Sequence, residues 1–173
     1  GGNPQDPAFR ELLIRWFEWA TYCPVMRLHG DRQPSEAVYR QDGSRALNSG
    51  SDNEVWSFGD EAYEILTRYL HRREEMRDYV RILMREAHEA GKPLMRAMFY
   101  AFPREEACAA LKDQYMFGDR YLVAPVMQPG ARRRAVYLPR GAWKELHTGR
   151  VFAGGMTIEA EAPLDVIPVF ERM

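Results

Sequence analysis

Few residues in this sequence combine a side chain and a setting suited to chemistry, and His29 is the first of them. It follows the apolar run Val25-Met26-Arg27-Leu28 and precedes Gly30 and Asp31, at the head of a long polar stretch. Catalytic and binding residues of α/β folds gather where strands end. An imidazole there can bind a ligand hydroxyl, and Asp31 can orient the imidazole or the ligand. The residues alone nevertheless favour a structural or surface histidine, and an Asp after Gly is also common in turns.

Trp56 is the second candidate, at the point where the polar stretch 31–53 ends. That stretch is longer than ordinary connections, and such long loops in compact domains are usually functional or disordered. The indole ring is suited to be a stacking platform for a sugar ring, or a hydrophobic staple at the start of the next helix. Both interpretations stay open at this stage.

Other familiar chemistry has no signature here. The sequence contains no glycine-rich phosphate loop, no Cys/His set with metal-ligand spacing and no nucleophile-elbow serine. Its carboxylates cannot be paired into an acid/base couple by spacing. We expect no cofactor and no metal, and we assign the run Arg132-Arg133-Arg134 to a solvated turn.

The elements that position these candidates begin with a helix. Asp6 followed by Pro7 predicts an N-cap and a first helical residue, and Pro24 ends the element. Its apolar residues predict one broad buried face: Phe9, Leu12, Leu13, Trp16, Phe17 and Ala20. The run 25–30 predicts a short buried strand.

A long helical pattern follows. Ser57 with Asp60 resembles a capping box, and Gly91 ends the pattern. Because the 3.6-residue period slips near Arg73, we expect a bend or two helices there. The apolar stretch 94–102 then predicts a strand buried on both faces, as in α/β sheets.

The C-terminal part changes character. Short β-rich runs separated by Gly and Pro turns predict an antiparallel sandwich or barrel: 121–126, 135–138, 157–160 and 166–170. The fold class is therefore α/β plus all-β. We expect one domain over residues 1–108 and a second over 109–173.

Composition excludes several classes of protein. The 173 residues carry 24 Lys+Arg against 25 Asp+Glu, for a net charge of −1, so we expect no nucleic-acid partner. No apolar run approaches the roughly 20 residues of a membrane span, and no signal peptide is visible. Cys23 and Cys108 lie far apart and suit thiols in a reducing compartment. We expect a cytoplasmic location.

A series of motifs, in order along almost the whole chain, resembles the late part of glycoside hydrolase family 31, the α-glucosidases, α-xylosidases and their relatives. The motifs are Arg15-Trp16, Cys23-Pro24-Val25-Met26-Arg27-Leu28-His29-Gly30, Arg96-Ala97-Met98-Phe99-Tyr100-Ala101-Phe102-Pro103, Gly118-Asp119, Leu122-Val123-Ala124-Pro125-Val126 and Ile167-Pro168-Val169-Phe170.

The resemblance implies the terminal portion of a (β/α)₈ barrel followed by a small antiparallel β-sandwich, which the chain would carry in truncated form. It also implies a retaining, exo-acting α-glycosidase, with one carboxylate as nucleophile and one as acid/base. In the family both are aspartates on earlier barrel strands, and no motif here matches them. We therefore expect a fragment without catalytic residues, inactive alone.

The resemblance also implies roles for individual residues. His29 matches the family histidine that hydrogen-bonds sugar hydroxyls. Together with Asp31 and Trp56, which are candidates from the residues alone, it forms the expected binding set for an oligosaccharide or α-glycoside. Arg27 is expected in a structural ion pair. The run 53–57 slightly favours the α-xylosidase branch. A non-catalytic carbohydrate-binding module, using His29, Trp56 and Trp143, and a structural remnant are the alternatives, and a homo-oligomer stays open.

Overall fold

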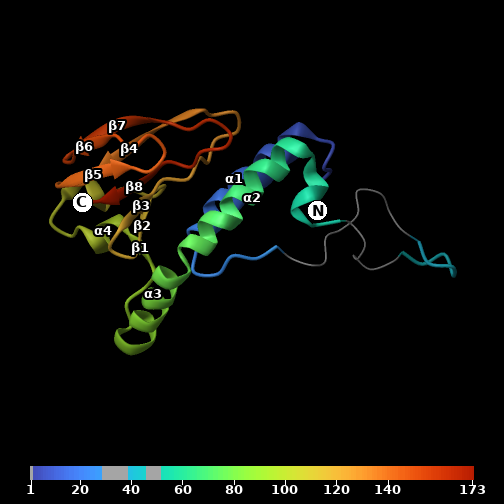
Figure 1. The fold of residues 1–173 in the computed structure, drawn as a ribbon, viewed down its shortest axis with the longest axis horizontal. Coiled ribbons are helices and arrows are strands. Elements are labelled where there is room, and N and C mark those ends of the chain that lie inside the picture. The colour runs from blue at the N-terminus through green and yellow to red at the C-terminus, as the bar shows by residue number, and fades with distance from the viewer. Residues whose placement is uncertain (1, 29–38, 46–51) are drawn as a thin grey trace.

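The computed structural model describes residues 2–28, 39–45 and 52–173. The chain first forms a group of helices and then an antiparallel β-structure (Figure 1). The helices are α1 (Pro7–Thr21), the 3₁₀ turn η1 (Val55–Phe58), α2 (Asp60–Glu75) and α3 (Arg77–Ala90). Helices α1 and α2 lie side by side, and α3 follows α2 and extends away from the two sheets in the view of Figure 1.

The N-terminus of α1 forms as predicted. Asp6 has an extended backbone, and its carboxylate accepts a 2.9 Å hydrogen bond from the amide of Ala8, with Pro7 in the first turn. The predicted interruption of the long helix is also present, at Met76, where one helix ends and the next begins. Gly91 ends α3 with a left-handed backbone, at φ +65°, as expected for a glycine in that position.

The start of α2 differs from the prediction. Its N-cap is Gly59, and Ser57 lies inside η1, where its hydroxyl donates to Glu54. Asp60 and Glu61 occupy the first turn instead, where carboxylates face the positive end of the helix dipole.

The β-structure consists of two antiparallel sheets. One is six-stranded, in the order β1-β2-β3-β8-β5-β6, and the other pairs β4 with β7. The strands are β1 (Met95–Ala97), β2 (Tyr115–Phe117), β3 (Tyr121–Val123), β4 (Arg133–Leu138), β5 (Ala142–Glu145), β6 (Val151–Ala153), β7 (Met156–Glu161) and β8 (Val169–Arg172). The short helices α4 (Met98–Ala101) and α5 (Glu106–Ala109) connect β1 to β2.

Two predicted strands take other forms. The stretch 94–102 gives only β1, which pairs antiparallel with β2, and then turns into α4. The described part of the run 25–30, residues 25–28, forms no strand. A parallel barrel strand needs a neighbouring strand for its hydrogen bonds, and no described strand lies beside this run. Within the described residues no barrel closes. The proposed division at 108/109 passes between β1 and β2, which are hydrogen-bonded partners.

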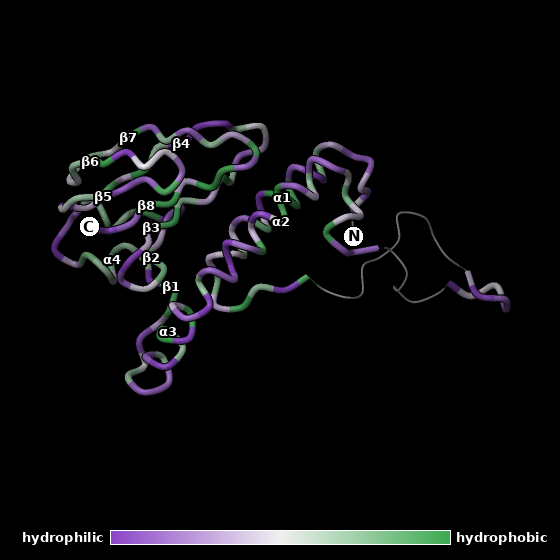
Figure 2. Tube along the Cα trace, viewed as in Figure 1, coloured by the Kyte–Doolittle hydropathy of each residue, from purple (hydrophilic) through white to green (hydrophobic). Residues whose placement is uncertain are grey.

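Three hydrophobic clusters hold these layers together, and the distribution of apolar segments along the chain is visible in Figure 2. The helix cluster contains Ile14, Phe17, Phe58, Ala62, Ile65 and Leu66. The junction cluster contains Tyr22, Met76, Leu83, Leu94, Phe117, Tyr121, Val123, Ile167 and Val169. The sandwich core contains Met98, Cys108, Met116, Leu122, Ala124, Val136, Leu138, Trp143, Ala160 and Phe170, drawn from both sheets. The predicted sandwich is thus present.

Candidate functional site

The predicted binding set divides between described and undescribed residues. His29 and Asp31 lie outside the described residues, so their roles stay predictions. Trp56 is described: it lies in η1 with 68% of its surface exposed. Its neighbours Val55 and Phe58 make the apolar contacts that hold this turn on the helix cluster. The staple interpretation of Trp56 is therefore wrong, because Val55 and Phe58 perform that packing and the indole faces outward.

Two described residues that flank the polar stretch 31–53 pack against the same hydrophobic cluster. Leu28, directly before His29, and Val55, directly before Trp56, are both partly buried against the helix cluster. The described residues on either side of the polar stretch 31–53, a stretch that the sequence left open as functional or disordered, thus pack on the same cluster. An exposed ring such as that of Trp56 would suit the apolar C–H face of a sugar.

Two side chains distant in the sequence hold the turn after α1 by its backbone carbonyls. The guanidinium of Arg73 on α2 donates to the backbone carbonyls of Thr21 at 2.8 Å, Cys23 at 2.7 Å and Pro24 at 2.9 Å. The hydroxyl of Tyr115 on β2 donates to the carbonyl of Tyr22 at 2.9 Å. Sequence reasoning missed this arrangement, since nothing in the local pattern connects an arginine and a tyrosine so distant in sequence to this turn.

Arg27, which lies between this turn and residue 29, is exposed. The expected structural ion pair of Arg27 is absent among the described residues. Burial raises the pKa of the Cys23 thiol above its usual value, so this cysteine stays protonated and is no candidate nucleophile.

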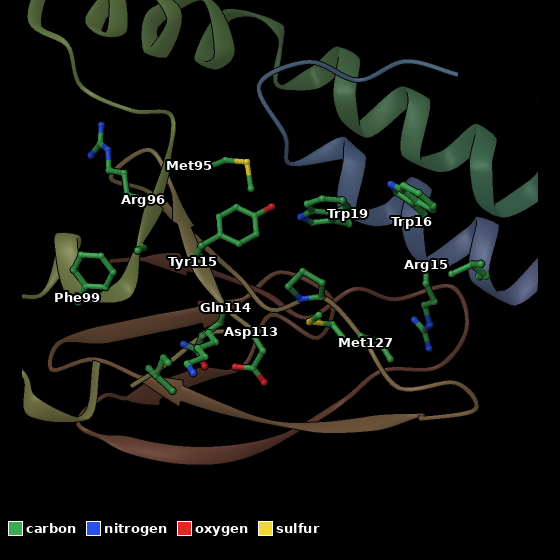
Figure 3. A pocket seen from close by; sticks show the side chains of 16 residues that line it. Arg15, Trp16, Trp19, Met95, Arg96, Phe99, Asp113, Gln114, Tyr115 and Met127 are labelled. Carbon is green, nitrogen blue, oxygen red and sulfur yellow. The ribbon is translucent and has the colours of Figure 1, made fainter. Parts of the chain in front are cut away.

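A groove of about 740 Å³ lies between α1 and the β1–β2 region (Figure 3). The groove is mainly apolar, and its lining includes Leu12, Trp16, Trp19, Phe99, Tyr115 and Met127. Leu12 and Trp16 are more than half exposed. The prediction of one apolar face on α1 is therefore wrong: Ile14 and Phe17 are buried on one side, and Leu12 and Trp16 line the groove on another. Apolar residues around most of a helix were the available signal for two contact surfaces.

Two further expectations change with the structure. Trp143 is fully buried in the sandwich core and donates its indole N–H to the Pro139 carbonyl at 2.7 Å, so it cannot stack on a sugar. The binding-module alternative loses one of its three contacts. Arg134 is not a solvated turn residue, because it lies in β4 and donates to Asp113 Oδ2 at 2.8 Å. Arg132 and Arg133 pair with Glu11 and with Glu159 and Glu161.

No group of three or more metal-binding side chains occurs among the described residues. A search of the same residues for a helix long and apolar enough to cross a membrane found none.

Comparisons with known proteins place this architecture in a family. The Glycosyl hydrolases family 31 TIM-barrel domain matches residues 1–81, and the Glycosyl hydrolase family 31 C-terminal domain matches residues 91–173. A crystal structure of a family 31 α-xylosidase from a soil metagenome, complexed with xylose, superposes with a TM-score of 0.89 at 47% identity over 99% of this chain. Alpha-xylosidase A of Aspergillus niger is 33% identical over 98% of the chain, and Alpha-glucosidase 2 of Bacillus thermoamyloliquefaciens is 32% identical over 92%.

The chain is thus built as the end of a barrel domain joined to a β-sandwich domain of a glycoside hydrolase. It belongs to glycoside hydrolase family 31. The chain spans 26% of the soil-metagenome enzyme, 24% of the Aspergillus protein and 18% of the Bacillus protein.

Proposed function

We propose that the whole protein to which this chain corresponds is a retaining, exo-acting α-glycosidase that releases terminal α-linked xylose. The observation that carries this proposal is the likeness to the xylose-complexed α-xylosidase, at 47% identity over nearly the whole chain. An α-glucosidase is the second candidate, supported by the 32% identity to Alpha-glucosidase 2.

In this proposal the catalytic carboxylates come from outside residues 1–173. One attacks the anomeric carbon, while the second protonates the leaving oxygen and later activates water. The present chain supplies substrate contacts. His29 and Asp31 hold hydroxyls of the sugar through hydrogen bonds that strengthen as the ring flattens toward the oxocarbenium-like transition state, and such bonds raise kcat. Trp56, with its exposed ring, offers an apolar face to the substrate.

The test measures kcat/KM of the full-length protein on an aryl α-xyloside and the matching aryl α-glucoside. We expect a preference for the xyloside, and no turnover by residues 1–173 alone. A preference for the glucoside selects the second candidate. A folded full-length protein that hydrolyses neither substrate overturns the proposed activity, and turnover by residues 1–173 alone overturns the placement of the carboxylates.

The role of His29 has its own test in the full-length protein. His29→Ala and His29→Gln should lower kcat and kcat/KM together, by roughly thirty- to a thousand-fold, because a hydrogen bond made in a dry site at the transition state is lost. The thermal midpoint should hardly change. Near-wild-type kcat/KM in either folded variant removes His29 from the substrate site.

Location and assembly are also part of the proposal. A cytoplasmic location is supported by Cys23 and Cys108, which are both free thiols in the structure. Self-association of the isolated chain is supported by the exposed apolar residues of the groove beside α1.

A further inference from the structure

The turn at residues 21–24 has all four of its backbone carbonyls bound by side chains. Arg73 binds three of them and Tyr115 binds the fourth. The two side chains arrive from different parts of the fold, Arg73 from α2 and Tyr115 from β2. One helix and one sheet therefore fix a single turn.

Arg73 supplies hydrogen-bond donors at the C-terminal end of α1. The last carbonyls of a helix have no partner within the helix, and the helix dipole makes this end negative. The last turn of α1 has no basic residue of its own. The planar guanidinium of Arg73 presents several donors in a fixed arrangement, so it can hold several carbonyls at once. Among the described residues no carboxylate forms an ion pair with Arg73, so its charge is directed at the backbone.

Tyr115 adds a constraint of a different kind. Its strand is paired on both sides, with Ala97 opposite it on β1 and Val123 opposite it on β3. A hydroxyl on such a strand has little freedom to move relative to the sheet. The sandwich, as well as the helices, therefore fixes the position of the turn.

The chain between this turn and residue 29 is short and is itself supported. After Pro24, only four residues precede His29. Met26 and Leu28, in this segment, pack against the helix cluster. At about 3.3–3.6 Å per extended residue, four residues leave little slack to absorb a displaced turn.

We propose that Arg73 and Tyr115 are positioning residues, which fix the turn at 21–24 and thereby the segment 25–28 that leads into the substrate-binding histidine. The proposal rests on the proposed function in its catalytic part. It gives the sandwich a role in substrate binding that packing alone would not give it, because Tyr115 belongs to the six-stranded sheet.

The first test removes a single hydroxyl from the full-length protein. Tyr115→Phe should lower kcat/KM on the preferred aryl α-glycoside by about three- to tenfold, since small misplacements of a substrate contact reduce rates. Tyr79→Phe is the matched control, because the Tyr79 hydroxyl also donates to a backbone carbonyl, that of Phe117 at 2.9 Å, and is also partly buried. Tyr79→Phe should stay within about twofold of wild type. Equal effects of the two variants overturn the proposal.

A double-mutant cycle shows whether Tyr115 acts through the histidine. In a His29→Ala background the added Tyr115→Phe substitution should lower kcat/KM by less than twofold, because the group being positioned is already gone. A full, additive loss in that background overturns the proposed route.

Backbone hydrogen exchange provides a readout that needs no substrate. Amides of residues 25–28 in the full-length protein should exchange faster in Tyr115→Phe and in Arg73→Lys, whose compact ammonium cannot hold three carbonyls as the guanidinium does. They should not do so in Tyr79→Phe. Unchanged exchange at 25–28 overturns the positioning role even in an active enzyme. If the full-length protein hydrolyses neither aryl glycoside, the proposed function is overturned. The hydrogen-exchange result still tests the positioning role of Arg73 and Tyr115 in that case.

Discussion

Arg15 of α1 donates a 2.7 Å hydrogen bond from Nη2 to the backbone carbonyl of Ala162, beyond the end of β7. The same guanidinium donates to the carbonyls of Val166 at 3.0 Å and Ala131 at 3.2 Å, and it forms a 3.1 Å ion pair with Glu18. Both side chains of the pair are almost completely buried. One arginine therefore joins the helix layer to loops of the sandwich.

Arg15→Met should be strongly destabilising, because it removes every one of these bonds and leaves the buried Glu18 carboxyl and three backbone carbonyls without their donor. Each buried polar group left unsatisfied in this way costs about 1–3 kcal/mol. Urea unfolding of residues 1–173 measures the loss. Arg81→Met is the control, because Arg81 forms an exposed pair with Asp78 and such pairs contribute about 1 kcal/mol or less. Similar small losses in the two variants would contradict the role given to Arg15.

Glu18 should make the stability depend on pH. Burial raises the pKa of Glu18 to about 8, and Arg15 offsets only part of that effect. Because the folded-state pKa lies above the usual 4.5, the folded protein binds the proton more tightly than the unfolded chain does. The contribution of Glu18 is then fully present below about pH 4.5 and is lost as pH rises to about 8. The free energy of unfolding of Glu18→Gln, compared with wild type across that range, should lack this decline. Parallel profiles would contradict the assignment.

Gly118 should tolerate alanine less well than Gly149. Both have a left-handed backbone, at φ +63° and +73°, which costs a Cβ-bearing residue about 1–2 kcal/mol. A Cβ at Gly149 meets open space, whereas one at Gly118 would lie 2.1 Å from Tyr79 Oη and 2.7 Å from Leu83 Cδ2. Gly118→Ala should therefore lose about 1–3 kcal/mol more than Gly149→Ala in urea unfolding. Equal losses would show that the α3 side chains move aside freely.

Local signals in the sequence were sufficient where the structure is decided locally. The Asp6-Pro7 start of α1, the interruption of the long helix and the Gly91 end of α3 all follow from the preferences of a few adjacent residues. The sandwich followed from the spacing of short β-rich runs and turns.

The features that the sequence did not predict depend on contacts between residues distant in the sequence. β1 is antiparallel because it finds β2 about twenty residues later, and apolar composition alone cannot distinguish that pairing from a parallel one. The groove face of α1 and the contacts of Arg73 and Tyr115 likewise depend on tertiary packing. For the site, the sequence left Trp56 open as a stacking platform, which its exposure permits. It assigned the same possibility to Trp143, whose burial depends on both sheets closing around it.

The groove beside α1 should make residues 1–173 bind a hydrophobic dye and associate with increasing concentration. Its lining is mainly apolar, and four of its side chains are more than half exposed: Leu12, Trp16, Phe99 and Met127. Exposed apolar side chains gathered in one groove favour contact with apolar ligands and with other copies of the chain. Trp16→Lys should reduce both dye fluorescence and association, measured by light scattering or sedimentation. Leu70→Lys is the control, since Leu70 is an exposed apolar residue that does not line the groove. Equal reductions in the two variants would show that association does not depend on the groove.

Trp56 is either a platform for the substrate or an ordinary surface residue, and replacing it distinguishes the two roles. With 68% of its surface exposed, it contributes little to folding, so Trp56→Ala should leave the thermal midpoint nearly unchanged. If the indole is a platform for the sugar, Trp56→Ala should raise the KM of the full-length enzyme by roughly two- to tenfold, in line with the roughly 0.5–1.5 kcal/mol of an aromatic contact. Phe58→Ala, two residues later in the same turn, should lose about 3–5 kcal/mol of stability, because Phe58 is buried in the helix cluster. An unchanged KM in folded Trp56→Ala would remove the indole from the substrate site and leave it as a surface residue.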